Sequence, residues 1–265
     1  MKKGPKTVPN VMGHVQTWED ISQGEMAGAV LSKILVHFQF DVMGVDEPVR
    51  QPFDLEDAIR QWSENVSTKS GLVYGQLILE QKKSPHAGFM VNWQRQPAGL
   101  WLNSISLSAD PEYFPDKGRL ERFLDLIEAI FSLVRAGYGT VSDSLEWDEK
   151  AWVDETLPDG RRAEVSVSLK AQEGLVDLYW ANLFGPPYVR RFGADRIESC
   201  PGVAVRKIGP EAYRLLTAPT PFQWSDPSVR AACESAKRHL DPTIFVDKAH
   251  PDRKPAPPDW RLDKP

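Results

Sequence analysis

The chain contains the run Trp180-Ala-Asn-Leu-Phe-Gly-Pro-Pro-Tyr-Val-Arg-Arg-Phe-Gly193, and this stretch decides the fold. An apolar, aromatic-rich segment leads into it from Leu175. Gly185 permits a turn at positive φ, and the two prolines after it fix the chain where a short helix can begin. The run therefore predicts a strand, a corner and the start of a helix.

Length and composition indicate an ordinary globular protein. At 265 residues, roughly three quarters of the unfolded surface can be buried, so the core needs no disulfide or metal. The composition is 41% hydrophobic and 26% charged, and the longest apolar stretches are far shorter than the about 20 residues of a transmembrane helix. The positively charged start lacks the apolar stretch of a signal peptide. We therefore expect a cytoplasmic protein in which Cys200 and Cys233 are free thiols.

The remaining sequence predicts an α+β fold, with a mainly antiparallel sheet and helices packed on it. Runs of β-prone residues predict strands at 29–40, 72–80, 87–94, 100–108, 162–170, 175–184, 202–208 and 212–217. Helical spacing of apolar residues predicts helices at 52–65, 116–136, 188–197 and 227–240. Asp54 and Asp226 are the expected N-caps of two of these helices, and Gly137 is the expected end of helix 116–136.

No linker-like stretch interrupts the middle of the chain. We therefore predict one α+β domain over residues 1–246, and two sub-halves meeting near 143–158 remain the alternative. From residue 247 to 265 the chain is rich in proline and poor in apolar residues. This tail is either disordered or laid over the body, where Trp260 can anchor it.

The charge is placed unevenly along the chain. Residues 141–160 hold seven acids and one base, a local charge of −6 that leaves +1 for the rest of the chain. With two tryptophans among the acids, the segment suits a docking surface for a basic partner, because charges steer the encounter and aromatics anchor it. The alternative is a solvated acidic loop whose tryptophans fold back onto the core. The candidate binding residues are Asp143, Glu146, Trp147, Asp148, Glu149, Trp152, Asp154 and Glu155.

Catalytic and metal-binding motifs are missing from the sequence. It has no Gly-rich phosphate loop, no Gly-x-Ser-x-Gly elbow, no His-Glu-x-x-His and no Cys-x-x-Cys. The five histidines are scattered, and we interpret His37, inside a strand pattern, as structural. We therefore predict no catalytic residues, no metal and no cofactor. Because the chain is acidic overall, we also expect no direct binding of nucleic acid, and no membrane partner.

The run 180–193 resembles the corresponding run of the immunity protein 52 family, found with bacterial polymorphic toxins and some type VI secretion effectors. The similarity is clearest over residues 175–217, and over 29–138 it extends only to the order of elements. Arg190, Arg191 and Cys200 have no counterpart in a known family role. We interpret the signature residues as structural: Trp180, Asn182, Phe184, Gly185, Pro186, Pro187, Tyr188, Phe192 and Gly193.

The resemblance implies an inhibitor that is produced together with a toxin and protects the producing cell by binding it one to one. The family is associated with nuclease toxins of the restriction-endonuclease fold, so a toxin with a cytoplasmic target is expected. Two alternatives remain open. One is an enzyme acting on a small ligand, with a pocket lined by Trp93, Trp101 or Trp180. The other is an adaptor of the secretion apparatus. The sequence leaves the oligomeric state undetermined.

Overall fold

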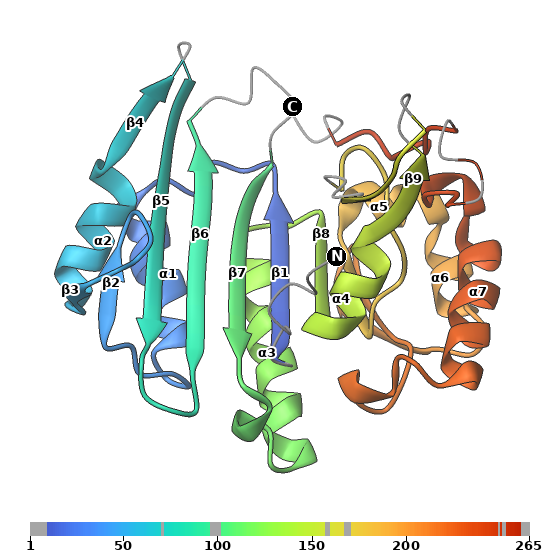
Figure 1. Cartoon of the computed structure of the whole chain (residues 1–265), viewed down its shortest axis with the longest axis horizontal. Coiled ribbons are helices and arrows are strands. Elements are labelled where there is room, and N and C mark those ends of the chain that lie inside the picture. Colours follow the sequence, from blue (N-terminus) through green and yellow to red (C-terminus); the bar gives the residue numbers. More distant parts are fainter. Residues whose placement is uncertain are drawn as a thin grey trace. The chain divides into compact units, whose positions relative to one another are not determined.

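The computed structural model describes residues 10–69, 72–95, 102–156, 160–166, 171–248, 250 and 253–260. The chain forms two compact units, Asn10–Val141 and Ser142–Pro265 (Figure 1). Helices and antiparallel strand pairs occur in both units, which confirms the predicted α+β class.

The first unit is built on a sheet with the strand order β3-β2-β5-β6-β7-β1-β8, and β4 pairs with the other end of β5. Its strands are β1 (Val11–Thr17), β2 (Val42–Gly44), β3 (Gln51–Pro52), β4 (Val66–Lys69), β5 (Leu72–Gln81), β6 (Ala87–Gln94), β7 (Asn103–Ala109) and β8 (Tyr138–Asp143), whose last residues belong to the second unit. Strands β5, β6 and β7 pair antiparallel in sequence order, which confirms the predicted meander. Strand β1 was not predicted, and it pairs antiparallel with β7.

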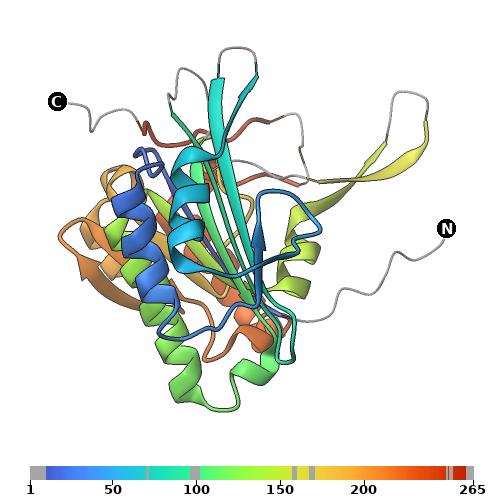
Figure 2. The ribbon, with the colours of Figure 1, turned by 90° about the vertical axis from the view of Figure 1, so that its left-hand side faces the viewer.

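Three helices cover one face of this sheet: α1 (Gly24–Ile34), α2 (Leu55–Glu64) and α3 (Lys117–Leu133) (Figure 2). Every second residue of β1, β6 and β7 is buried, as expected for strands with one face against a core. The indole Nε1 of Trp93 on β6 donates to the carbonyl of Trp62 on α2, at 2.9 Å. This bond fixes one large ring of the sheet against the helix layer.

The predicted helices 52–65 and 116–136 are confirmed as α2 and α3. Asp54 and Asp116 cap them by accepting the backbone N–H groups of Asp57 and Arg119, at 2.9 and 2.8 Å. The predicted end of α3 at Gly137 is wrong. Arg135 takes the positive φ of 48°, and the N–H of the next residue bonds back to the carbonyl of Phe131, which completes the usual C-terminal motif without glycine.

The predicted strand 29–40 is wrong. Helix α1 occupies the first half of it and buries Ala27, Val30, Leu31 and Ile34, which follow the helical spacing of three, four and seven residues. This helical pattern begins before residue 29, whereas the β-prone residues that predicted a strand lie at the end of the range 29–40. His37 is exposed after the helix and is not part of a strand.

The second unit contains a three-stranded sheet, β12-β13-β11, and a separate hairpin of β9 and β10, all antiparallel. Its elements are α4 (Ser144–Ala151), β9 (Trp152–Thr156), β10 (Arg162–Ser166), β11 (Ala181–Phe184), α5 (Pro186–Phe192), α6 (Ala194–Glu198), β12 (Ala204–Gly209), β13 (Ala212–Leu216) and α7 (Pro227–Leu240). Hairpin β12–β13 and helix α7 confirm the predictions for 202–217 and 227–240.

The signature run departs from its prediction at two glycines. Gly185 has a φ of −93° and acts as the N-cap of α5, so the positive-φ turn predicted there is wrong. The positive φ of 84° occurs at Gly193 instead, where it divides the predicted helix 188–197 into α5 and α6. The predicted strand 175–184 is also too long, because only its last four residues, β11, form one.

Part of the C-terminal tail lies against the second unit. Trp260 is 6% exposed, and its ring meets that of Tyr188 edge-on at 6.1 Å. The N–H of Ala256 donates to the carbonyl of Thr243 at 2.8 Å. Over residues 253–260 the tail is therefore laid on the body with Trp260 as its anchor.

We expect Gly75→Ala to lower the free energy of unfolding by about 2 kcal/mol, because a Cβ at this position would lie 2.2 Å from the buried ring of Trp93. The ring is held by its bond to Trp62, so it cannot move away cheaply. Gly28→Ala in α1 is the control, since its Cβ would only touch Ile59 at 3.5 Å. It should gain up to about 1 kcal/mol from helix propensity. Equal unfolding midpoints of the two variants in urea would contradict this packing.

Candidate functional site

Residues 144–156 of the acidic segment fold as α4 followed by β9, so this part is not a loop. Asp143 is buried and caps α4 by accepting the N–H of Leu145 at 3.0 Å. Burial raises the pKa of this carboxyl group, and the bond from Leu145 acts against that shift. The negatively charged Glu146 lies in the first turn of α4 and the positively charged Lys150 in its last turn, so both charges interact favourably with the helix dipole.

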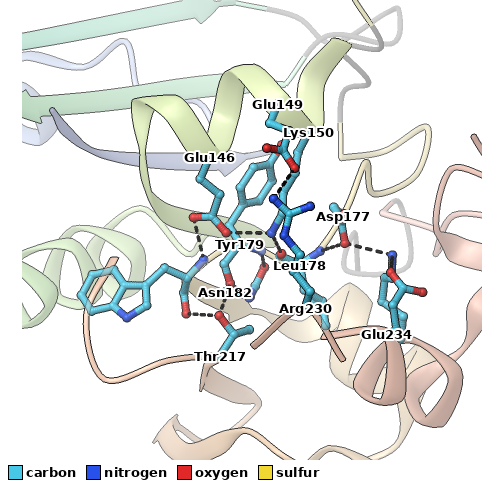
Figure 3. Close-up of polar contacts among 12 residues, drawn as sticks. Glu146, Glu149, Lys150, Asp177, Leu178, Tyr179, Asn182, Thr217, Arg230 and Glu234 are labelled. Carbon is cyan, nitrogen blue, oxygen red and sulfur yellow. Dashed lines mark hydrogen bonds and ion pairs between the residues drawn. The ribbon is translucent and has the colours of Figure 1, made fainter. Parts of the chain in front are cut away.

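The inner face of α4 carries a buried ion pair (Figure 3). Glu146 is 0% exposed, and its Oε1 lies 2.7 Å from the Nζ of Lys150, one helical turn later. Its Oε2 accepts the backbone N–H of Trp180 at 3.1 Å, while the Lys150 ammonium also donates to the carbonyl of Leu178 at 2.5 Å. Burial raises the pKa of Glu146, and the Lys150 charge opposes the rise. The pair therefore bonds directly to the backbone of residues 178–180.

Asn182 completes this network from the signature run. Its amide Nδ2 donates to the carbonyl of Tyr179 at 2.8 Å, and its Oδ1 accepts the N–H of the same residue at 3.0 Å. The hydroxyl of Thr217 donates to the carbonyls of Tyr179 and Trp180, both at 3.3 Å. These side chains satisfy backbone groups that a strand would otherwise pair, which explains why residues 178–180 lie outside β11 (Figure 3).

Most of the other signature residues are also interior, and Pro186 and Gly193 are half-buried. The indole Nε1 of Trp180 donates to the carbonyl of Ala218 at 2.9 Å, and the hydroxyl of Tyr188 donates to the carbonyl of Ala171 at 2.6 Å. The rings of Phe184, Tyr188 and Phe192 form a cluster with centroids 5.2 to 5.7 Å apart. Pro186 and Pro187 open α5 after the cap at Gly185.

The outer face of α4 is exposed. Leu145 and Glu149 lie one helical turn apart on α4, and Trp152 is the first residue of β9; Leu145 and Trp152 are 39% and 46% exposed. Glu149 forms a surface ion pair with Arg230 on α7, at 2.7 Å, and the Arg230 guanidinium lies over the ring of Trp224.

The eight predicted binding residues therefore divide between the interior and the surface. Asp143 and Glu146 are interior groups with structural contacts, and Trp147 stacks on Tyr179 at 5.1 Å. Asp148 is half-buried, whereas Glu149 and Trp152 are exposed. Asp154 and Glu155 lie in β9, where the side chains are outside the described part.

A cavity of about 450 Å³ opens beside α4 and α7. Its charged lining residues comprise four cations and four anions: Lys150, Arg230, Lys237 and Lys248 with Glu149, Asp177, Glu234 and Asp247. Lys237 lies 3.0 Å from Asp177 and also pairs with Glu234. The sequence does not point to the α7 members of this lining, Arg230, Glu234 and Lys237, because they come close to α4 only in the folded chain.

Neither a membrane span nor a metal site is found in the parts of the chain that the structure describes. None of the helices there is both long and apolar enough to cross a bilayer. Within the same residues, no group of three His, Cys, Asp or Glu side chains is placed to hold a metal ion. Cys200 and Cys233 are buried free thiols. Two of the predicted pocket residues, Trp93 and Trp180, are buried in the core, and Trp101 lies outside the described residues.

No protein-family model and no curated protein matches the chain. A similar solved structure is the Pseudomonas aeruginosa T6SS protein PA0821, where T6SS denotes the type VI secretion system. The TM-score is 0.60 at 14% identity, and the match covers 94% of this chain and 78% of that one. An identity this low shows a shared fold. The resemblance to the immunity protein 52 family stays a hypothesis.

We expect Glu146→Gln to lower the free energy of unfolding by about 3 kcal/mol, because the Lys150 ammonium would remain buried without its carboxylate. The amide oxygen of glutamine can still accept the N–H of Trp180, so the loss reports on the ion pair. Adding Lys150→Met removes the unpaired charge and should recover most of the stability.

The matched control is Glu121→Gln in α3, which removes the carboxylate of an exposed i, i+4 pair with Lys117. Its effect should stay below about 0.5 kcal/mol. Thermal or urea unfolding gives all three values. A double variant less stable than Glu146→Gln alone would contradict the role given to the buried charge.

Proposed function

We propose that this chain is an immunity protein. It binds and neutralises a cognate antibacterial toxin of a type VI secretion system that acts in the cytoplasm. The resemblance of residues 180–193 to immunity protein 52 supports this proposal, and so does a fold shared over 94% of the chain with a protein of that secretion system. The protein acts by occupying a surface of the toxin, and it catalyses no reaction.

The observation that carries the proposal is the contrast between the two faces of α4. The inner face is fixed to residues 178–180 by Glu146 and Lys150, whereas on the outer side Leu145 of α4 and Trp152, the first residue of β9, are exposed to solvent. Tryptophan is enriched among the residues that dominate protein–protein binding, and a rigid support reduces the entropy lost on association. This outer face is therefore suited to anchor a protein partner.

Charge on the same face favours a nuclease as the toxin. A nuclease has a basic groove for the phosphate backbone, and an acidic surface attracts such a groove from a distance. Asp148 and Glu149 remain on the outer side, but Asp143 and Glu146 are used inside the protein. The acidic surface offered to the toxin is therefore smaller than the sequence predicts, and the exposed Trp152 has a larger share in binding.

The chemistry of the described serine, histidine and cysteine residues supports binding over catalysis. Burial raises the pKa of Cys200 to about 11 and raises that of Cys233, which keeps both thiols protonated at neutral pH. His14 contacts Ser106 at 2.8 Å, but burial lowers the pKa of His14 to about 4, so it is a weak base.

The second serine–histidine contact is also unsuitable. Nε2 of His239 lies 2.9 Å from the carbonyl of Arg196, and since a carbonyl only accepts, this nitrogen must donate its proton there. It is then unavailable as a base for Ser199, 3.3 Å away, whose hydroxyl donates to the carbonyl of Asp195.

Co-expression tests the proposal. The toxin gene is expected beside the gene for this chain, and its induction alone should kill the host. Induction of both genes should restore growth, and the two proteins should purify as one complex. An adaptor of the secretion apparatus would leave the cells unprotected, and an enzyme would protect them without forming a stable complex. Either result would contradict the proposal.

We expect Trp152→Ala to weaken toxin binding about 30-fold, the loss typical of an aromatic residue central to an interface. Glu149→Lys should mainly slow association, and the difference should shrink at high salt, because a surface charge acts by steering. Titration calorimetry and stopped-flow association measure the two effects.

Tyr74→Ala and Glu211→Lys are the matched controls, because both residues are exposed and neither belongs to α4 or β9. They should bind like the wild type. Equal losses in the control and test variants would remove the outer face of α4 from the interface.

A further inference from the structure

A second pocket lies in the first unit, and none of its lining residues belongs to the acidic segment. Its volume is about 270 Å³, and it is lined by residues that follow α1, by the short 3-10 turn η1 (Pro111–Tyr113) with the residue after it, and by the first turns of α3. Aromatic side chains form its floor, and two arginines stand at its rim.

The aromatic floor is already ordered. Phe38 and Phe123 are buried, and their ring centroids lie 6.3 Å apart. Tyr113 lies 5.1 Å from Phe38, and Phe114 lies 5.2 Å from Phe123, both half-buried. The hydroxyl of Tyr113 donates to Gln81, which fixes its ring. A partner side chain entering here would meet rings that need little ordering.

The rim carries the positive charge of two arginines. Arg119 and Arg122 are exposed at i and i+3 on α3, and neither has an acidic partner among the described residues. The nearby Asp116 is used as the helix cap. His37 completes the rim, and its pKa is lowered by partial burial and by the charge of Arg122, so the positive charge comes from the arginines.

An exposed apolar residue adjoins the arginines. Val36 lines the same pocket and is 78% exposed, the highest value among the large apolar side chains exposed in the described chain. Exposed apolar surface beside unpaired arginines is the composition of a protein-binding hot spot, where arginine and aromatic residues are enriched.

The size and charge of the pocket indicate its occupant. Small-molecule sites usually exceed about 300 Å³, whereas this pocket suits one large apolar side chain. Two guanidinium groups at its mouth suit one carboxylate. Residues 10–141 hold 17 acids and 11 bases, a net charge of −6, which repels a polyanion such as nucleic acid but tolerates a single carboxylate on a protein.

We propose that this pocket is a second anchor point for the cognate toxin. It receives a large apolar side chain of the toxin, and an aspartate or glutamate beside that side chain pairs with Arg119 and Arg122. The inference rests on the proposed function. It adds a positively charged contact to the negatively charged contact at α4. Recognition of the toxin would then depend on two local charge patterns and not on the overall charge of this protein.

The test is calorimetric titration of the purified cognate toxin into the full chain. We expect Arg119→Glu/Arg122→Glu to weaken binding about 30-fold. Lys33→Glu/Lys83→Glu makes the same change in net charge at exposed lysines that do not line the pocket, and it should bind like the wild type. Thermal unfolding checks that both variants fold.

A second variant leaves the arginines in place. Val36→Glu puts a carboxylate of this chain beside them at an exposed position, where it competes with that of the toxin and should weaken binding about tenfold.

The outcomes separate the two proposals. Wild-type protein that does not bind the toxin overturns the immunity function together with this pocket. Wild-type binding that both pocket variants retain in full overturns the pocket alone. A single-stranded oligonucleotide that binds the wild type but not Arg119→Glu/Arg122→Glu also overturns it, because the occupant would then be a nucleic acid.

Discussion

The second unit depends on the ion pair between Glu146 and Lys150. Backbone groups inside a protein need hydrogen-bond partners, and residues 178–180 lie in the interior outside β11, where side chains supply partners for most of these groups. The carboxylate accepts from Trp180, and the ammonium donates to Leu178. Because both charges sit on α4, the bonds that satisfy this segment also hold the helix in place.

This constraint gives the acidic segment two roles that its composition does not distinguish. A buried charge is tolerated only with a close partner and further hydrogen bonds, and Glu146 has both. Glu149, one helical turn after Glu146, is exposed and makes a surface pair with Arg230, which contributes little to stability. The inner acid therefore serves folding, while the outer acid and Trp152 remain available to a partner.

The sequence predicted those helices and hairpins that are marked by neighbouring residues, such as a capping aspartate or a turn-forming glycine. Helices α2 and α3 were predicted because an aspartate cap precedes a clear apolar period, and the turn after Gly209 marked hairpin β12–β13. Strand 29–40 failed because a helical and a β-prone pattern overlap there. For Gly185, composition indicates a turn, but the backbone angle depends on the packing around it.

The candidate sites were predictable only in part, because both depend on contacts between residues distant in sequence. The spacing of Glu146 and Lys150 suggests a pair, but it does not show that Trp180 and Leu178 cover the pair. The arginine pocket joins Phe38 to residues of α3, and no sequence pattern connects these segments.

The proposed mode of action is occupancy, in which each molecule of this protein silences one molecule of toxin. The most direct measurement is a titration of the purified protein into a fixed, tight-binding concentration of active toxin, with the remaining toxin activity followed at each step. The account predicts a linear fall that reaches zero at equal molar amounts. Loss of toxin activity at amounts far below equimolar would reveal catalysis by this protein, and full activity at an excess would show that it is no inhibitor, so either result would contradict the account.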